Sequence, residues 1–165
     1  MKKYIITGGP GTGKTTTITE LEKRGYVTVP EAGRSVITEE LLKERSILPW
    51  TDLYKFQRLV TRRQGDLEAR ILTGQEAIAF LDRGLIDNLA YCRQGGIAVP
   101  PELLQGISQA DYAGVFLLEP LPLYQTDDER RENRRKAAEL HDLIEVVYQE
   151  HGLTPVTVPV LTPAE

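Results

Sequence analysis

Residues 3 to 15 read Lys-Tyr-Ile-Ile-Thr-Gly-Gly-Pro-Gly-Thr-Gly-Lys-Thr, and this stretch decides the fold. Within it, Gly8, Gly13, Lys14 and Thr15 stand at the offsets of the G-x-x-x-x-G-K-[ST] phosphate-binding loop. Glycines let the backbone bend round an anion with several N–H groups pointing inward. Such a loop ends at a helix N-terminus, whose partial positive charge favours phosphate. The stretch therefore predicts a phosphate-binding loop between a strand and a helix.

The residues on either side of the loop supply the context that the motif requires. Tyr4, Ile5 and Ile6 form an apolar run typical of a buried parallel strand. After the loop, Ile18 and Leu21 recur at helical spacing. A glycine-rich turn that binds nothing is the alternative, and the flanking strand and helix argue against it.

We expect ATP to bind at this loop together with Mg²⁺. Lys14 would reach the β- and γ-phosphates, and the hydroxyl of Thr15 would ligate the metal. The expected nucleotide contacts are Gly9, Pro10, Gly11, Thr12, Gly13, Lys14, Thr15 and Thr16.

The composition is that of a single globular domain. The chain has 165 residues, 41% of them apolar and 27% charged, so we expect one domain over residues 1–165. The net charge of −4 argues against a dedicated nucleic-acid-binding protein. The apolar runs are too short to span a bilayer, and the N-terminus lacks the pattern of a signal peptide. Cys92 is the lone cysteine and forms no internal disulfide, which fits the reducing cytoplasm. From the cysteine and the short apolar runs together, we expect a cytoplasmic protein without a membrane partner. The oligomeric state stays open.

Strand-like and helix-like segments alternate along the chain. Apolar β-type runs occur at residues 4–6, 26–30, 77–81, 115–118 and 155–159, and helical patterns separate them. This alternation predicts an α/β fold with right-handed crossovers and a five-stranded parallel sheet covered by helices on both faces. A further helix would normally cover the exposed side of the last strand, so we expect a truncation at the C-terminus.

Polar side chains follow the predicted strands, where ligands gather in open parallel sheets. Glu31 and Arg34 follow the second strand, Asp82 and Arg83 the third, and Glu119 the fourth. Asp82 is a candidate Mg²⁺ partner, with capping of the next helix as the alternative. Glu31 is a candidate general base for a substrate hydroxyl, with a purely structural ion pair to Arg34 as the alternative.

A long helix predicted at about residues 53–72 has an apolar stripe that polar side chains interrupt. These side chains are Gln57, Arg63 and Gln64. Their burial would be costly without partners, and a substrate pocket would supply such partners. Placement of the three side chains on the surface by a slightly rotated helix is the alternative.

A charged run occupies residues 127–136, ahead of a helix predicted around residues 140–148. It could be a solvated helical face with i,i+4 ion pairs. It could also be a lid, over about residues 121–137, whose arginines close over the phosphates. Its position between the fourth strand and the last helix favours the lid.

Several stretches resemble a family of small P-loop kinases known as predicted ATPases of the AAA type. They are residues 5–15, 30–34, 80–84 and 119–121, and the pattern Tyr124-x-Thr126-Asp127-x-x-Arg130. The family is similar to the ribosylnicotinamide kinase domain of bifunctional NAD-biosynthesis regulators. It is more distantly similar to deoxynucleoside and thymidylate kinases.

This resemblance implies a strand order of 2-3-1-4-5 and a lid that donates arginines, among them Arg130. It also implies that Glu31 is the base and that Asp82 and Arg83 form a functional pair. The sequence departs from nucleoside kinases at Gly84, where those enzymes often carry a hydroxyl or an aromatic residue.

Motif and resemblance together predict ATP- and Mg²⁺-dependent phosphoryl transfer to a small-molecule acceptor, a nucleoside or nucleotide. The alternative is an ATPase or nucleotide-dependent switch that acts on a protein partner. An oligomeric motor is the disfavoured version of this alternative, because it would need a helical C-terminal domain for which 165 residues leave no room. The acceptor itself cannot be named, because pocket specificity depends on side-chain placement. The expected catalytic residues are Lys14, Glu31, Asp82 and Arg130, and the expected substrate contacts are Glu31, Arg34, Gln64 and Arg83.

Overall fold

A computed structural model of the chain describes residues 1–44, 46–71, 77–122 and 128–160, with the backbone alone at residues 128–132. Five parallel strands form one sheet in the order β2-β3-β1-β4-β5. This order confirms the one that the family resemblance implies. The strands are β1 (Lys2–Thr7), β2 (Val27–Val29), β3 (Ile78–Asp82), β4 (Tyr112–Leu118) and β5 (Val156–Val158).

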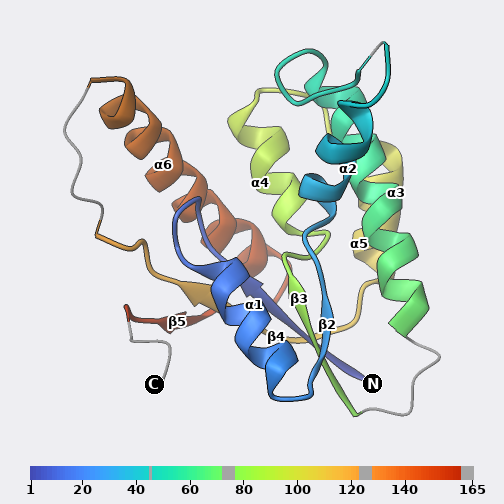
Figure 1. Cartoon of the computed structure of the whole chain (residues 1–165), viewed down its shortest axis with the longest axis vertical. Coiled ribbons are helices and arrows are strands. Elements are labelled where there is room, and N and C mark those ends of the chain that lie inside the picture. The colour runs from blue at the N-terminus through green and yellow to red at the C-terminus, as the bar shows by residue number, and fades with distance from the viewer. Residues whose placement is uncertain (45, 72–76, 123–127, 161–165) are drawn as a thin grey trace.

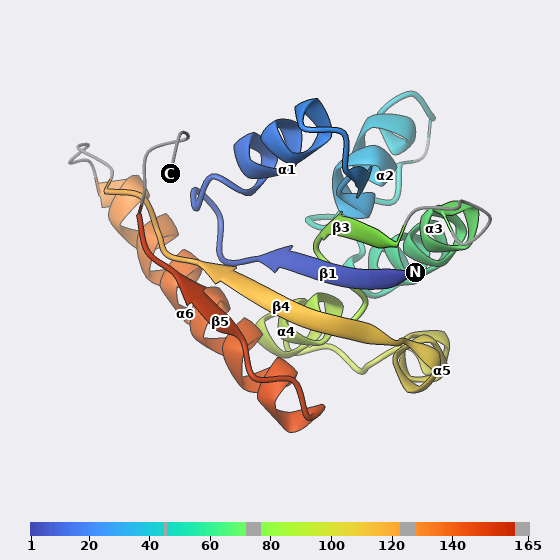
Figure 2. The ribbon, with the colours of Figure 1, turned by 90° about the horizontal axis from the view of Figure 1, so that it is seen from below.

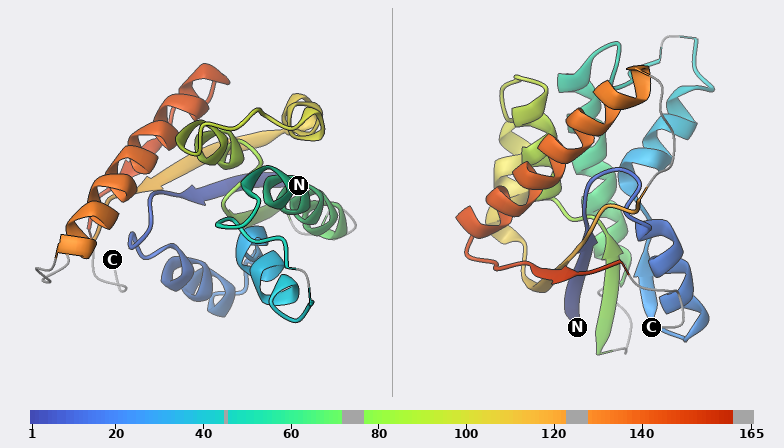
Figure 3. Two further views of the ribbon diagram at one scale, coloured as in Figure 1. Left: turned by 90° about the horizontal axis from the view of Figure 1, so that it is seen from above. Right: turned by 90° about the vertical axis from the view of Figure 1, so that its left-hand side faces the viewer.

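Helices cover both faces of this sheet, as the alternating pattern predicts. Helix α1 lies on one side, whereas α4, α5 and α6 lie on the other (Figures 2 and 3). Helices α2 and α3 pack against each other near the β2 edge (Figure 1). The helices are α1 (Lys14–Lys23), α2 (Ala32–Glu40), α3 (Leu53–Ile71), α4 (Asp87–Gln94), α5 (Pro101–Gln109) and α6 (Asp128–Glu150).

Successive residues of the central strand face opposite helical layers. Ile5 is fully buried in a core cluster with Leu89 of α4 and Ile144 of α6. Ile6, the next residue, packs instead with Ile18 of α1. Because side chains alternate across a strand and this sheet is covered twice, both residues must be apolar. The same reasoning explains the continuous apolar run that identifies the strand in the sequence.

Among the described residues, the charged run and the helix expected after it form one helix, and the lid itself stays a prediction. Helix α6 runs without a break from Asp128 to Glu150, so the charged run is its first turns. Arg135 and Glu139 form an i,i+4 ion pair of 3.5 Å on this helix, which is the support expected of a solvated helical face. Residues 123–127 and the side chain of Arg130 lie outside the described part, so the role of that arginine stays a prediction.

Helix α4 begins at Asp87, directly after a tight turn. The N–H of Asp87 donates to the carbonyl of Gly84 at 3.2 Å, which closes a turn at residues 84–87. Gly84 itself has no room for a side chain, because a Cβ there would lie 2.9 Å from Cδ1 of Ile5 and 3.1 Å from the Tyr112 ring. This close packing explains why glycine replaces the larger residue of nucleoside kinases. Among the described helices, none is long and apolar enough to cross a membrane.

Candidate functional site

The phosphate-binding loop joins β1 to α1 and passes close to two other elements. Gly8 and Gly13 have φ angles of 140° and 83°, a range that residues with a Cβ rarely adopt. A Cβ on Gly8 would also lie 2.7 Å from the Leu118 carbonyl oxygen at the end of β4. Gly8 is therefore required both by the turn and by the packing of the loop against β4, and Gly13 is required by the turn.

Helix α6 packs directly on this loop. The N–H of Gly9 donates to Nδ1 of His141 at 3.2 Å. A Cβ on Gly9 would lie 2.8 Å from the Ala137 carbonyl oxygen, so the two backbones leave no space for a larger residue. The described part of α6 thus fixes one side of the loop through backbone and histidine contacts.

Lys14 lies folded over the loop, and its expected contact with the phosphates stays a prediction. Its Nζ donates to the Gly9 carbonyl at 2.7 Å and to Oγ1 of Thr12 at 3.1 Å. Burial, followed by the positive charge of Arg83, lowers the pKa of Lys14 to about 8. A bound polyphosphate would bring negative charge to this amine and favour its protonated form.

Asp82 ends β3 beside the loop and caps no helix. It is 3% exposed, and its Oδ1 has no hydrogen-bond partner among the described residues. Burial and then the charge of Glu31 raise the pKa of Asp82 to about 6. With Thr15 it lines the α1–α2 groove, a hollow of about 410 Å³ between these two helices. A carboxylate and a hydroxyl placed together fit the oxygen ligands that Mg²⁺ takes beside phosphates.

Arg83 connects the loop to the carboxylates around it. The residue has a φ of 70° and is 8% exposed. Its Nη1 donates to the Gly8 carbonyl at 3.2 Å and lies 3.4 Å from Asp87, and its Nε lies 3.4 Å from Glu31. The guanidinium also lies 5.3 Å from the centre of the Tyr91 ring. This arginine is held from several sides at the point where the loop meets the next pocket.

Asp87, at the start of α4, anchors this arrangement and was missed by the sequence analysis. It is fully buried and accepts hydrogen bonds from the Thr7 hydroxyl, the Gly84 N–H at 2.9 Å and the Tyr148 hydroxyl at 2.5 Å. The available signal was an acidic residue four positions after Arg83, the spacing of a helical ion pair. Its other partners come from β1 and α6, which no local pattern reveals.

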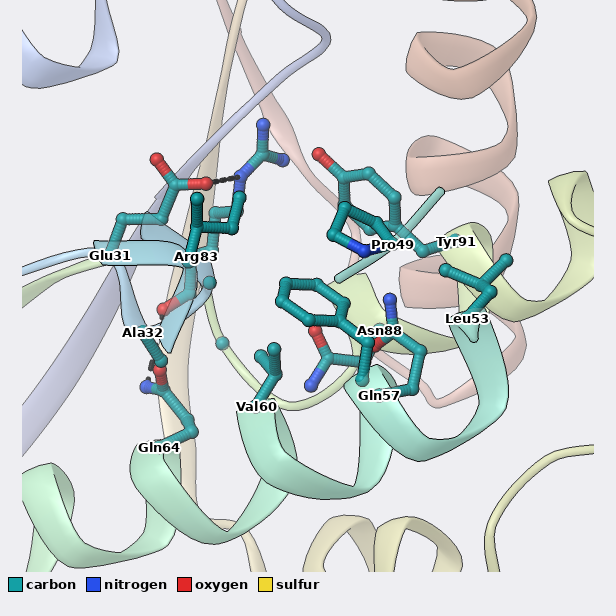
Figure 4. Close-up of a pocket in the computed structure, with 14 residues that line it drawn as sticks. Glu31, Ala32, Pro49, Leu53, Gln57, Val60, Gln64, Arg83, Asn88 and Tyr91 are labelled. Carbon is teal, nitrogen blue, oxygen red and sulfur yellow. Dashed lines mark hydrogen bonds and ion pairs between the residues drawn. The ribbon is translucent and has the colours of Figure 1, made fainter. Parts of the chain in front are cut away.

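A second hollow, here called the α2–α4 pocket, opens beside Arg83 and has a volume of about 160 Å³. Glu31 and Arg83 lie on one side of it, and Gln57 and Asn88 on the other (Figure 4). The lining residues are Glu31, Ala32, Gly33, Ile37, Pro49, Leu53, Phe56, Gln57, Val60, Gln64, Arg83, Gly84, Asn88 and Tyr91.

The structure brings only some of the predicted substrate contacts into this pocket. Glu31, Gln64 and Arg83 line it together. Gln64 is itself engaged, because its Nε2 donates to Glu68 at 2.9 Å and to the Arg83 carbonyl at 3.4 Å. Arg34 lines the α1–α2 groove instead, 3.8 Å from Glu31, with a side chain 68% exposed.

The interrupted stripe of α3 divides between the pocket and the surface. Gln57 and Gln64 are buried and line the pocket, so surface placement does not apply to them, and their contact with a substrate stays a prediction. Arg63 turns away and pairs with both carboxylate oxygens of Glu39 at 2.6 Å. A one-residue step along a helix rotates a side chain by about 100°, which separates these neighbours.

Three buried atoms of the pocket have no hydrogen-bond partner among the described residues. They are Oε1 of Gln57, Nδ2 of Asn88 and Nε of Arg83. Buried polar atoms are normally paired, since an unpaired one costs about 1–3 kcal/mol. Their concentration in one hollow makes the α2–α4 pocket a candidate ligand-binding site.

A third hollow lies on the other side of the loop. The α1–β5 groove, of about 520 Å³, is lined by Thr12, Thr16 and Thr17 of the loop and α1, and by Val158 and Val160 at the end of β5. Glu119, which follows β4, also lines it. The phosphate loop therefore lines the α1–β5 groove directly, whereas it is linked to the α2–α4 pocket through Arg83.

Comparison with known proteins agrees with this architecture. Thymidylate kinase from Ehrlichia chaffeensis superposes with a TM-score of 0.65 at 14% identity, over 98% of this chain and 88% of that one. A NadR protein in complex with NR gives a TM-score of 0.71 at 18% identity, over 94% of this chain and 43% of that one. The NadR protein in complex with NAD and AMP-PNP gives a TM-score of 0.72 at 18% identity, over 98% of this chain and 46% of that one. The chain thus spans less than half of the NadR proteins.

Sequence comparison adds the family. A search of curated proteins found no match. The family model of the AAA domain matches residues 3–165, which is nearly the whole sequence. With its phosphate loop, its strand order and this match, the chain belongs to the AAA domain family.

Proposed function

We propose that this domain, over residues 1–165, is an ATP- and Mg²⁺-dependent kinase that phosphorylates a small metabolite of the nucleoside or nucleotide class. The observation that carries the proposal is the position of Arg83. It contacts Gly8 of the phosphate loop and lies beside Glu31 in the α2–α4 pocket. A phosphoryl donor on the loop and an acceptor in the pocket would therefore meet at one cation, as phosphoryl transfer requires.

ATP would lie along the loop with its phosphates against residues 9–16. The α1–β5 groove continues from Thr12 and Thr16 to the end of β5 and offers space for the base and ribose. This placement leaves the α2–α4 pocket free for a second substrate. A groove lined by the phosphate loop and a separate pocket linked to the loop by Arg83 suit a two-substrate reaction better than simple hydrolysis.

Thr15 and Asp82 would hold Mg²⁺. The unpartnered Oδ1 of Asp82 supports this assignment, since a buried carboxylate oxygen without a donor is suited to a cation. Within the described residues, no group of three or more His, Cys, Asp and Glu side chains could hold a metal. The metal would therefore arrive with the nucleotide, where it neutralises charge on the phosphates.

Glu31 would act on the acceptor. It lines both the α1–α2 groove and the α2–α4 pocket, so it stands between the Mg²⁺ side and the acceptor side. The acceptor hydroxyl would give its proton to Glu31 and form a bond to the γ-phosphorus, while the bond from that phosphorus to the bridging oxygen breaks and ADP leaves. Lys14 and Arg83 would stabilise the charge on the transferring group. Arg130, in the first turns of α6, would supply a further positive charge that stabilises the transferring group.

The similar structures support the reaction class, not the substrate. One is a thymidylate kinase, and another is a NadR protein in complex with NR. Identities of 14% and 18% relate the fold alone. A cytoplasmic location, where ATP and Mg²⁺ are available, suits the proposed reaction.

The test is acceptor-dependent release of ADP. Purified protein, ATP and Mg²⁺ are incubated with nucleosides, nucleotides and pyridine ribosides in separate reactions. The proposal expects at least one acceptor to raise ADP release above the rate without acceptor, and Lys14→Ala to abolish the increase. ATP hydrolysis that no acceptor changes would refute the kinase and favour an ATPase or switch acting on a protein partner.

A further inference from the structure

We infer that the α2–α4 pocket selects an unphosphorylated acceptor whose head is one planar six-membered ring with an amide-like polar edge. Gln57 and Asn88 would recognise that edge. The inference rests on the proposed function and deepens it, because it names the chemical class of the acceptor.

The size of the pocket limits the ring. Its volume is about 160 Å³. An apolar protein cavity of about 150 Å³ accommodates one benzene molecule. The pocket therefore fits one six-membered ring, whereas a fused bicyclic purine would need the lining residues to move. The remainder of the acceptor would extend toward Glu31 and Arg83, where the phosphoryl group is transferred.

The walls of the pocket suit a flat apolar ring. Leu53, Phe56 and Val60 of α3 line the pocket with carbon atoms, and Pro49 and Tyr91 add further apolar surface to it. Aromatic and branched side chains bind ring faces through dispersion and exclusion of water. Such walls hold a ring but give no information about its polar substituents, so specificity must come from the few polar atoms in the pocket.

Two of those polar atoms lack partners and have opposite character. Oε1 of Gln57 is an acceptor without a donor, and Nδ2 of Asn88 is a donor without an acceptor. Both side chains are at most 6% exposed, and both line the pocket from adjacent helices (Figure 4). A ring edge with a neighbouring N–H and C=O, as in a pyrimidine or a pyridine carboxamide, would satisfy both atoms at once.

The charges at the other end argue against a phosphate on the acceptor. Among the described residues that line the pocket, Arg83 alone is cationic. Its guanidinium already faces Glu31, Asp87 and the Gly8 carbonyl. A monophosphate entering here would meet the carboxylate of Glu31 with no free cation beside it. A neutral hydroxyl is the group that this end of the pocket can receive.

The experiment compares binding and transfer across a matched panel. Thermal stabilisation without ATP and ADP release with ATP and Mg²⁺ are measured for uridine, cytidine, a pyridine-carboxamide riboside, adenosine and guanosine. The 5′-monophosphates of the same compounds and a phenyl riboside complete the panel. The expected result is stabilisation by the monocyclic ribosides, with kcat/KM at least about tenfold above the purine, monophosphate and phenyl compounds, the effect of one well-made hydrogen bond.

Variants test the two amides. Gln57→Leu and Asn88→Leu should each raise KM for the preferred riboside by about 10- to 100-fold and leave stabilisation by ATP unchanged. Gln105→Leu is the matched control, because Gln105 is exposed on α5, outside the lining residues of the pocket, and should leave both measurements unchanged. If a leucine variant does not fold, Gln57→Glu and Asn88→Asp change the hydrogen-bond character at nearly constant shape and should produce the same loss.

The outcomes separate the inference from the proposed function. Preferred transfer to a monophosphate or a purine riboside would overturn the inference while the kinase assignment stands. Equal transfer to the phenyl riboside, or unaltered KM in both amide variants, would overturn the role of Gln57 and Asn88. Monocyclic ribosides that neither stabilise the protein nor react also overturn it. ATP binding without acceptor-dependent ADP release from any compound would refute the kinase itself.

Discussion

Replacement of Asp87 by alanine should strongly destabilise the protein. The carboxylate of Asp87 is fully buried and receives hydrogen bonds from Thr7, from the Gly84 N–H at 2.9 Å and from Tyr148 at 2.5 Å. Arg83 lies 3.4 Å away and would lose this counter-charge. Asp87→Ala removes the acceptor of every one of these groups and leaves them buried.

The expected loss follows from these contacts. Removal of one partner from a buried, hydrogen-bonded charge pair costs about 3–5 kcal/mol. A typical domain has a free energy of unfolding of about 5–15 kcal/mol, so the variant would lose a large fraction of its stability. At about 2–4 °C per kcal/mol for a chain of this size, the melting temperature should fall by roughly 6–20 °C.

Thermal and urea denaturation followed by circular dichroism would measure this loss. Glu150→Ala is the control, because Glu150 pairs with Arg93 on the surface and its side chain is 46% exposed; its midpoint should stay close to that of the wild type. Asp87→Asn keeps one acceptor oxygen, so its denaturation midpoint should lie between those of Asp87→Ala and Glu150→Ala. An Asp87→Ala protein as stable as the control would refute the reasoning that Asp87 anchors Arg83 and the loop.

The following predictions concern the reaction. Lys14→Ala should keep the fold and lose nucleotide-dependent thermal stabilisation; undiminished stabilisation by ATP would count against the loop as the binding site. Because a carboxylate must be ionised to bind a cation, and the pKa of Asp82 is raised to about 6, Mg²⁺ affinity measured by titration should fall as the pH drops below about 6. Asp82→Asn should raise the Mg²⁺ requirement at all pH values, and an unaltered requirement would assign the metal to another acid. Glu31→Gln should retain ATP affinity and lose acceptor-dependent transfer, whereas normal transfer would mean that no base is needed. Arg130→Ala should lower turnover by about 10²-fold, and near-normal turnover would remove this arginine from the mechanism.

Local patterns in the sequence are sufficient for the order and kind of the elements. The apolar runs and helical stripes predict the five strands and the helices between them, because backbone hydrogen bonding and side-chain period are local properties. The strand order needed the resemblance as well, since periodicity does not say which strands are neighbours. The continuity of α6 through the charged run could not be predicted from local patterns, because such a run is typical both of a lid and of a solvated helical face.

The candidate site was predictable where one short segment builds it and not where several elements meet. The loop from Gly8 to Thr15 carries its own geometry, so the motif identifies its position. Arg34 and Arg63 show the limit. Arg34 follows the second predicted strand, yet its side chain lines the α1–α2 groove and not the α2–α4 pocket. Arg63 interrupts the apolar stripe of α3, yet it pairs with Glu39 of α2. The rotation of each helix against its neighbours decides which way a side chain points.

The sequence by itself determined the phosphate-binding loop, the α/β architecture and the polar residues that end each strand. Only the tertiary structure decided that Asp87 anchors Arg83 and that Gln57 and Asn88 lie unpartnered in a hollow of about 160 Å³. Whether a buried polar atom is satisfied depends on donors and acceptors from β1, α3, α4 and α6, which are distant in sequence. Hydrogen-bond pairing in the interior is thus a property of the packed fold.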